Sequence, residues 1–257
     1  MKLRRNNVKK FEKLPDLHGA QYDAIEEFKP KSYLKLEKHL KSFLDYSNPE
    51  EIEKNPPVSA SMLIASWGLG KTTSYDIIIR KLLKNKRYNG YSIKIRAQEI
   101  SNFFDTYQDE EVFEHLPGNA DRFLFLISQI LLKNSIFRKR FPNIDENLGK
   151  DEGLIRDILL EIRKEFRFFF IFIDELEEVV RNENNIIPFI LKSIKDLLNG
   201  SSNIINSESN SELIHFLSFI LACTDAAFYE ISRHEQLEYQ YGGINRRIQK
   251  ERISGIS

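Results

Sequence analysis

The chain has 257 residues, of which 41% are hydrophobic, so it is long enough to bury a large core in one domain. Its 38 Lys and Arg balance its 38 Asp and Glu, so the molecule as a whole is not a polyelectrolyte, and nucleic-acid binding would need a local basic patch. The single cysteine, Cys223, excludes a disulfide framework, and no stretch approaches the roughly 18 apolar residues of a transmembrane helix, so we expect a cytoplasmic protein that does not span a membrane.

Residues 1–57 are predicted to form a basic helical segment. The first 41 positions contain eleven Lys or Arg against six Asp or Glu. From Tyr33 to Leu44, apolar side chains recur at helical spacing, which predicts an amphipathic helix that packs on the core. Because Pro56 and Pro57 disfavour a helix and precede the first apolar strand, we place the core domain at residues 58–257.

A short apolar run and a glycine-rich turn follow this segment. The run Met62 to Ile64 is typical of a buried strand, and the chain then passes through Gly68 and Gly70 into Lys71. Two glycines at this spacing allow successive backbone N–H groups to point inward around a polyphosphate. The sequence therefore predicts a phosphate-binding loop that consists of Ala65, Ser66, Trp67, Gly68, Leu69, Gly70, Lys71, Thr72 and Thr73.

The residue types at the end of this loop indicate its chemistry. Lys71 is placed to reach the β and γ phosphates, and the hydroxyl of Thr72 is the expected magnesium ligand. The amphipathic stretch from Tyr75 to Leu83 predicts a helix whose N-terminus faces the anion. The usual pattern has a glycine six positions before the lysine, where this chain has Ala65, a small residue that the position tolerates.

Three elements are predicted between the loop and the next motif. The turn Asn89-Gly90 introduces residues 91–96, an alternating segment that is typical of a partly buried strand. The segment from Arg122 to Lys133 is apolar around most of its circumference and predicts a largely buried helix. The segment from Gly153 to Phe166 predicts a second helix.

The second motif is a run of six bulky apolar residues, Phe168 to Ile173, which is typical of a central strand in a parallel sheet. Such a strand presents Asp174 at its C-terminal edge, where ligands of open α/β sheets bind. We predict that Asp174 holds magnesium, directly or through a water, opposite Thr72 and that Glu175 activates a water for attack on the γ-phosphate. The alternative is an ordinary buried strand capped by an acidic turn, since acidic residues continue to Glu178.

The last third of the chain contains further elements of both kinds. The stretch from Ile186 to Leu198 has helical periodicity, Asn199 to Ser211 is a polar loop, and Ile214 to Cys223 is an apolar strand that ends at Thr224. The five histidines are scattered without metal-ligand spacing, so we assign them no metal site. Alternation of strands with helices predicts an α/β fold, a three-layer α/β/α sandwich with a mostly parallel sheet.

The loop and the pair Asp174-Glu175 together resemble the additional-strand class of P-loop NTPases. The order of the pieces is similar to that in AAA+ and STAND ATPases, particularly the archaeal and bacterial ATPases that look like origin-recognition proteins. The resemblance extends over residues 33–257. It implies ATP and Mg²⁺ as ligands, and it implies that Thr224 is a sensor residue that contacts the γ-phosphate or the attacking water.

The resemblance also covers the C-terminal segment. Arg246 and Arg247 lie in a stretch similar to the arginine-bearing segment that leads to the last core strand, here expected at residues 252–254. An arginine of this kind often completes a neighbour's site, which would make a homo-oligomer or multi-subunit complex the active unit. A solvated basic turn is the alternative. In the resembled families a helical lid follows, and because this sequence ends at Ser257 we expect the lid to be absent or truncated, with truncation favoured.

The predicted function is Mg-dependent binding and hydrolysis of ATP that drives a conformational change or remodelling. The alternative is a slow nucleotide-dependent switch or DNA-binding module, such as a replication initiator-like protein or a defence-system subunit. In that case Lys29 to Lys41 and Phe137 to Arg140 would contact DNA phosphates, although a solvated helical face explains those charges equally well. A small-molecule kinase fits less well, because Glu175 suits activation of water better than transfer to a bound substrate.

Overall fold

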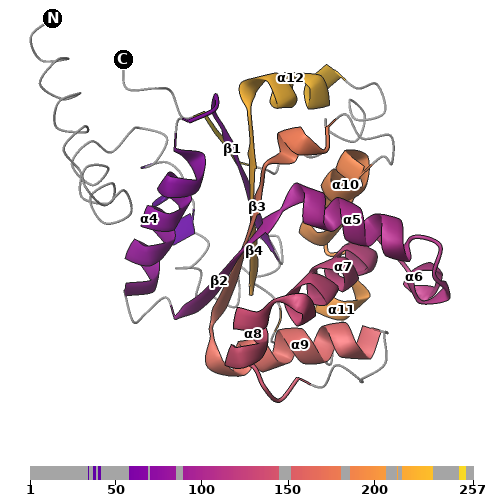
Figure 1. Ribbon diagram of the computed structural model, residues 1–257. Coiled ribbons are helices and arrows are strands. Elements are labelled where there is room, and N and C mark those ends of the chain that lie inside the picture. The colour runs from indigo at the N-terminus through magenta and orange to yellow at the C-terminus, as the bar shows by residue number, and fades with distance from the viewer. Residues whose placement is uncertain are drawn as a thin grey trace, which may run out of the picture.

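A computed structural model of the chain describes residues 34, 37, 38, 40, 41, 58–68, 70–84, 89–144, 152–180, 186–206, 213, 216–233 and 249–252. Within these residues, a single parallel sheet carries helices on both faces (Figure 1). None of the described helices is long and apolar enough to cross a membrane.

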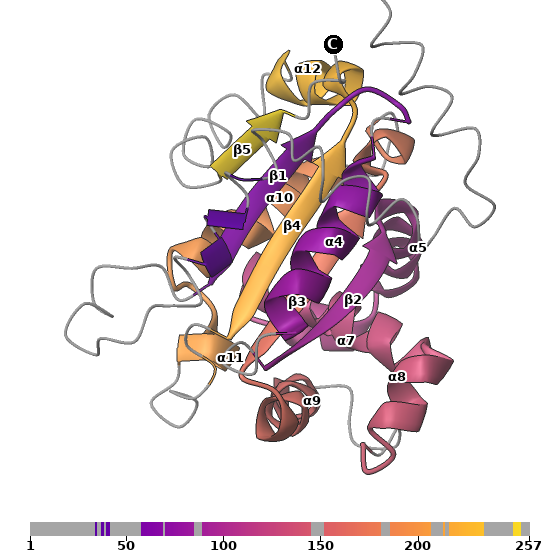
Figure 2. The same ribbon diagram turned by 90° about the vertical axis from the view of Figure 1, so that its left-hand side faces the viewer.

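The sheet consists of β1 (Ser59–Ile64), β2 (Gly90–Arg96), β3 (Phe168–Asp174), β4 (Leu217–Cys223) and β5 (Gln249–Arg252). All neighbouring strands are parallel, and their order is β2-β3-β4-β1-β5 (Figure 2). β4 therefore lies between the strand that precedes the glycine-rich loop and the Phe-rich strand. This extra strand between the two motif-bearing strands is the arrangement expected for the additional-strand class, and the predicted α/β sandwich is confirmed.

The helices form two unequal layers. Helix α4 (Lys71–Lys84) lies alone among the labelled helices on one face, in front of β3 and β4 in Figure 2. Most of the others lie on the opposite face, where they surround the larger apolar core (Figure 1). They are α5 (Ala97–Tyr107), α6 (Glu111–His115), α7 (Asn119–Lys133), α8 (Ser135–Arg140), α9 (Glu152–Glu165), α10 (Ile186–Leu198), α11 (Asn203–Asn206) and α12 (Asp225–Arg233), with a short 3-10 turn, η3 (Leu176–Glu178), after β3.

The Phe-rich strand β3 is buried on both faces. Phe168, Phe170 and Phe172 pack in the cluster beneath α4, while Phe169 and the isoleucines that alternate with them pack in the larger core. Every apolar residue of β3 is at most 3% exposed, which explains why the run shows no polar alternation. The predicted central strand is therefore confirmed, and it carries Asp174 to the C-terminal edge of the sheet.

Two strand boundaries differ from the sequence prediction. β4 begins at Leu217 rather than at residue 214, and β5 spans Gln249–Arg252 rather than 252–254. Among the described strands, β5 pairs with β1 alone and lies at the edge of the sheet. An edge strand forms backbone hydrogen bonds on one side only and can be polar, so the sequence of β5 lacks the apolar signal that marked the central strands.

The predicted polar loop at residues 199–211 contains the short helix α11. The carboxylate of Asp121, which is 1% exposed, accepts a hydrogen bond from the Ser202 hydroxyl over 2.5 Å and one from the Asn203 N–H over 3.3 Å. A side chain that lies 82 residues earlier in the chain thus caps this turn, so the residues of the loop itself do not predict the helix. Helices α5, α6, α8 and α12 also formed where no helix was predicted.

The described part of the N-terminal segment is helical at residues 34, 37, 38, 40 and 41. Leu40 is fully buried in the cluster beneath α4, together with Leu63 and Tyr75, whereas Leu34 is exposed. This contact agrees with a helix that packs on the core. The other residues of 1–57 lie outside the described part of the chain, and the domain boundary at 57 stays a prediction.

Candidate functional site

The predicted phosphate-binding loop connects β1 to α4. Gly68 and Gly70 have left-handed backbones with φ of 73° and 76°. A Cβ at Gly68 would meet no atom within 4 Å, so the backbone conformation rather than crowding requires glycine there. The Ser74 N–H donates to the Gly70 carbonyl over 2.7 Å, so α4 starts directly at the loop and its first N–H groups face it. Thr73 is half-buried in this first turn, and Leu69 lies outside the described residues.

Lys71 lies at the start of α4 and is only 9% exposed. Its Nζ donates to the backbone oxygen of Ala65 over 3.0 Å, so the ammonium group reaches back to the first residue of the loop. Ala65 is itself fixed to the sheet, because its N–H donates to the carbonyl of Cys223 over 3.2 Å. The structure therefore places the Lys71 ammonium beside the first residue of the loop, and its contact with phosphates stays a prediction.

Thr72 and Asp174 meet although 102 residues separate them in the chain: Thr72 Oγ1 donates to Asp174 Oδ2 over 2.6 Å. The other carboxylate oxygen, Asp174 Oδ1, accepts from the N–H of Glu175 over 3.0 Å. Hydroxyl and carboxylate oxygens suit Mg²⁺, which commonly takes one or two protein ligands and completes its shell with phosphate and water. The described residues contain no group of three or more His, Cys, Asp or Glu that could hold a metal.

Glu175 follows β3 with a left-handed backbone, φ 59°, the only positive φ among the described non-glycine residues. Such a conformation costs on the order of 1–3 kcal/mol and tends to occur at functional sites. Glu175 Oε2 is buried and accepts no hydrogen bond from the described residues, while Nε of Arg96 lies 3.4 Å from it. Burial raises the pKa of Glu175 and the Glu178 carboxylate raises it further, whereas Arg96 lowers it.

Thr224 lies at the tip of β4 and is 5% exposed. Its hydroxyl oxygen accepts from the N–H of Ala227 over 3.2 Å and so caps α12, and its backbone N–H donates to Oε2 of Glu177 over 3.2 Å. A hydroxyl that accepts one hydrogen bond can still donate its own proton. The predicted contact of Thr224 with the γ-phosphate or the attacking water stays a prediction.

Three residues at this edge of the sheet were missed in the sequence. Arg96 ends β2 directly opposite Asp174 in the strand register, and Glu177 follows β3. Asp225 follows β4, and its Oδ2 accepts from the Ser66 hydroxyl over 3.1 Å, which links the loop to α12. The C-terminal ends of parallel strands meet at one edge, so polar residues at all predicted strand ends are a signal that could have found them.

The remaining predicted site residues are Trp67 in the loop and the two arginines Arg246 and Arg247. Trp67 is 70% exposed on the loop. Arg246 and Arg247 lie outside the described residues. Most of the basic stretch 29–41 also lies outside them; of its described lysines, Lys41 forms an ion pair with Glu37 over 2.7 Å.

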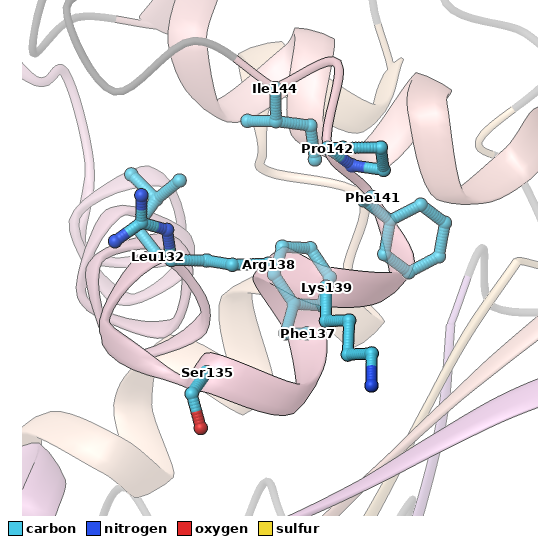
Figure 3. A pocket seen from close by; sticks show the side chains of 8 residues that line it. All are labelled: Leu132, Ser135, Phe137, Arg138, Lys139, Phe141, Pro142 and Ile144. Carbon is cyan, nitrogen blue, oxygen red and sulfur yellow. The ribbon is translucent and has the colours of Figure 1, made fainter.

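The second basic stretch forms α8, at the end of the sheet opposite to the loop (Figures 1 and 2). The ring of Phe137 contacts that of Tyr91 at the beginning of β2. A pocket of about 370 Å³ lies beside α8, and Arg138 and Lys139 are among the residues that line it (Figure 3). Arg140 instead forms an ion pair with a carboxylate of α9. Contact of this helix with DNA stays a prediction.

No family model and no curated protein matches the chain. Two similar solved structures are Cdc6p from Pyrobaculum aerophilum and a Walker-type ATPase of Pyrococcus abyssi. The first shares 13% identity over 93% of this chain and 48% of its own, with a TM-score of 0.44. The second shares 15% identity over 79% of this chain and 50% of its own, with a TM-score of 0.36. The chain thus spans about half the length of both, and its own strand order and loop carry the assignment to a P-loop fold.

Proposed function

We propose that the chain binds ATP together with Mg²⁺ and hydrolyses it, and that hydrolysis drives a conformational change or remodelling of a partner. The observation that carries this proposal is the meeting of Thr72 with Asp174, 2.6 Å apart, beside the loop that contains the buried Lys71. Two distant segments thereby assemble a positive charge, a row of backbone N–H groups and two hard oxygen ligands at one edge of the sheet. This combination suits a metal-bound polyphosphate.

The chain's own groups have separable tasks in the proposed reaction. The backbone N–H groups of residues 66–72 and the ammonium of Lys71 bind the phosphates and offset their negative charge. Thr72 and Asp174 would hold magnesium, which neutralises charge on the phosphate oxygens when it is bound. Glu175 orients a water toward the γ-phosphate and polarises it; its Oε2 accepts no hydrogen bond from the described residues, although Nε of Arg96 lies 3.4 Å away.

A slow nucleotide-dependent switch is the second candidate function. It is favoured by the ion pair between Arg96 and Glu175, because a carboxylate that is engaged by a guanidinium is less able to orient water. In such a switch the nucleotide-bound state, rather than turnover, would control a partner. DNA is the partner that the two basic stretches would suit.

The predicted assembly belongs to the same proposal. Arg246 or Arg247 would stabilise transition-state charge in a neighbouring subunit, which would make a homo-oligomer or a larger complex the active unit. An arginine in this role contributes a rate factor of about 10³ to 10⁵, so turnover per chain would rise steeply with protein concentration.

Removal of magnesium tests the proposed function. Phosphate release from ATP is expected with MgCl₂ and is expected to stop in excess EDTA, because without the metal no cation separates the Asp174 carboxylate from the phosphate oxygens. The measurement is inorganic phosphate release over time, with GTP as a parallel substrate to establish base preference. Metal-independent release at the same rate would contradict the assignment of Thr72 and Asp174, and absence of both binding and hydrolysis would refute the proposal.

The pH profile of this activity provides an independent check. Glu175 must be ionised to polarise water, and burial raises its pKa, so turnover should fall as the pH drops through an inflection above that of an ordinary glutamate. Arg96 lowers this pKa, so Arg96→Ala should move the inflection to higher pH. The measurement is kcat against pH for both proteins. An unchanged inflection in Arg96→Ala would show that Arg96 does not affect the pKa of the catalytic base.

A further inference from the structure

The candidate catalytic residues Glu175 and Thr224 come from neighbouring strands whose backbone pairing ends just below them. The last paired residues of β3 and β4 are Ile173 and Leu221. Beyond this pair β3 and β4 are no longer paired with each other, and each tip is held by its other neighbour: Asp174 pairs with Arg96 of β2, and Cys223 pairs with Ile64 of β1. A contact that joins the two tips directly would hold the water-orienting group and the predicted sensor at a constant separation.

Glu177 supplies a contact of this kind. Its Oε2 accepts from the backbone N–H of Thr224 over 3.2 Å, across 47 residues of sequence. The Glu177 carboxylate also contributes, after burial, to the raised pKa of Cys223, the residue that precedes Thr224. Both observations place the carboxylate against the end of β4.

Both ends of this contact belong to hydrogen-bonded turns. Glu177 belongs to η3, which follows Glu175 and is closed by a hydrogen bond of 3.0 Å from the Glu178 N–H to the Glu175 carbonyl. Leu176 of the same turn is fully buried. On the other side, the hydroxyl of Thr224 caps α12. The Glu177 carboxylate is therefore hydrogen-bonded to the backbone of the residue whose hydroxyl caps α12.

We propose that Glu177 is a positioning residue of the hydrolytic site: its carboxylate holds the Thr224 backbone, and thereby the Thr224 hydroxyl, at a fixed distance from Glu175. The proposal rests on the proposed ATPase function. Glu177 itself contacts no nucleotide in this role. It acts on the geometry of the transition state, in which a misplacement of about 1 Å can cost on the order of 10²-fold in rate.

Two substitutions separate the reach of the side chain from its charge. Glu177→Asp keeps the charge but shortens the side chain by about 1.5 Å, so its carboxylate no longer reaches the Thr224 N–H. Glu177→Gln loses the charge but keeps an acceptor oxygen at the same reach. We expect kcat to fall about tenfold in Glu177→Asp and to stay within about threefold of the parent in Glu177→Gln, with the Kd for MgATP unchanged in both.

Glu178→Asp is the matched control, because it makes the same change one residue along the turn at an exposed side chain, and it should leave kcat unaltered. The measurements are kcat from phosphate release, Kd for MgATP by calorimetry, and the thermal midpoint of each variant. If the parent chain hydrolyses ATP and Glu177→Asp matches it, or if Glu177→Gln loses as much activity as Glu177→Asp, the positioning role is refuted while the ATPase function stands. If Glu177→Asp weakens MgATP binding in parallel with kcat, Glu177 is a general structural residue. A parent chain without turnover refutes the ATPase function and this proposal with it.

Discussion

Lys71→Ala is expected to reduce the affinity for MgATP by about 10²- to 10³-fold while the fold is retained. The Lys71 ammonium is the charge that the structure places inside the loop, where it reaches the Ala65 carbonyl and is 9% exposed. Its loss would leave the phosphates with backbone N–H groups and magnesium alone. Titration calorimetry with MgATP measures the change, and circular dichroism checks the fold.

Lys192→Ala is a suitable control for this experiment, since Lys192 is an exposed lysine on α10, away from the loop. Its affinity for MgATP should equal that of the parent chain. Undiminished affinity in a folded Lys71→Ala variant would show that the loop is not the nucleotide site.

Glu175→Gln is expected to bind MgATP with parental affinity and to lower kcat by about 10² to 10⁴, because an amide cannot polarise water as a carboxylate does. The left-handed backbone of Glu175 and its buried Oε2, which accepts no hydrogen bond from the described residues, distinguish this side chain from the other acidic residues of the turn. Single-turnover hydrolysis separates the chemical step from product release. Glu178→Gln removes the same charge from the exposed end of the turn and should retain most of the activity.

Two other outcomes for Glu175→Gln would lead to different conclusions. Parental turnover would exclude Glu175 as the water-orienting group and leave the acidic turn as a helix start. Loss of MgATP binding would instead indicate that Glu175 takes part in metal binding together with Asp174.

The sequence predicted the central part of the fold because strands that are buried on both faces consist almost entirely of apolar residues. β3 is apolar on both faces and lies in the middle of the sheet, so its unbroken Phe-rich run was sufficient to identify it. The loop was identifiable for a related reason, since Gly68 and Gly70 have left-handed backbones that few other residues adopt. Both signals arise from local requirements of the chain.

The rest depends on contacts between distant segments. The cap of α11 comes from Asp121, and the contacts of Arg96 with Glu175 and of Glu177 with Thr224 join different strands. Nothing in the immediate neighbours of these residues encodes their partners. Strand order determines which ends become adjacent, and periodicity identifies strands without ordering them.

The exposed side chain of Trp67 allows the loop to be followed by intrinsic fluorescence. The chain contains a single tryptophan, and it lies four residues before Lys71, within the predicted nucleotide site. Intrinsic emission excited at the red edge of protein absorption therefore originates from this one position. Because the indole is 70% exposed, a ligand that covers it changes its solvent contact directly. The protein thus carries a native fluorophore that can follow occupancy of the loop in real time, without chemical labelling.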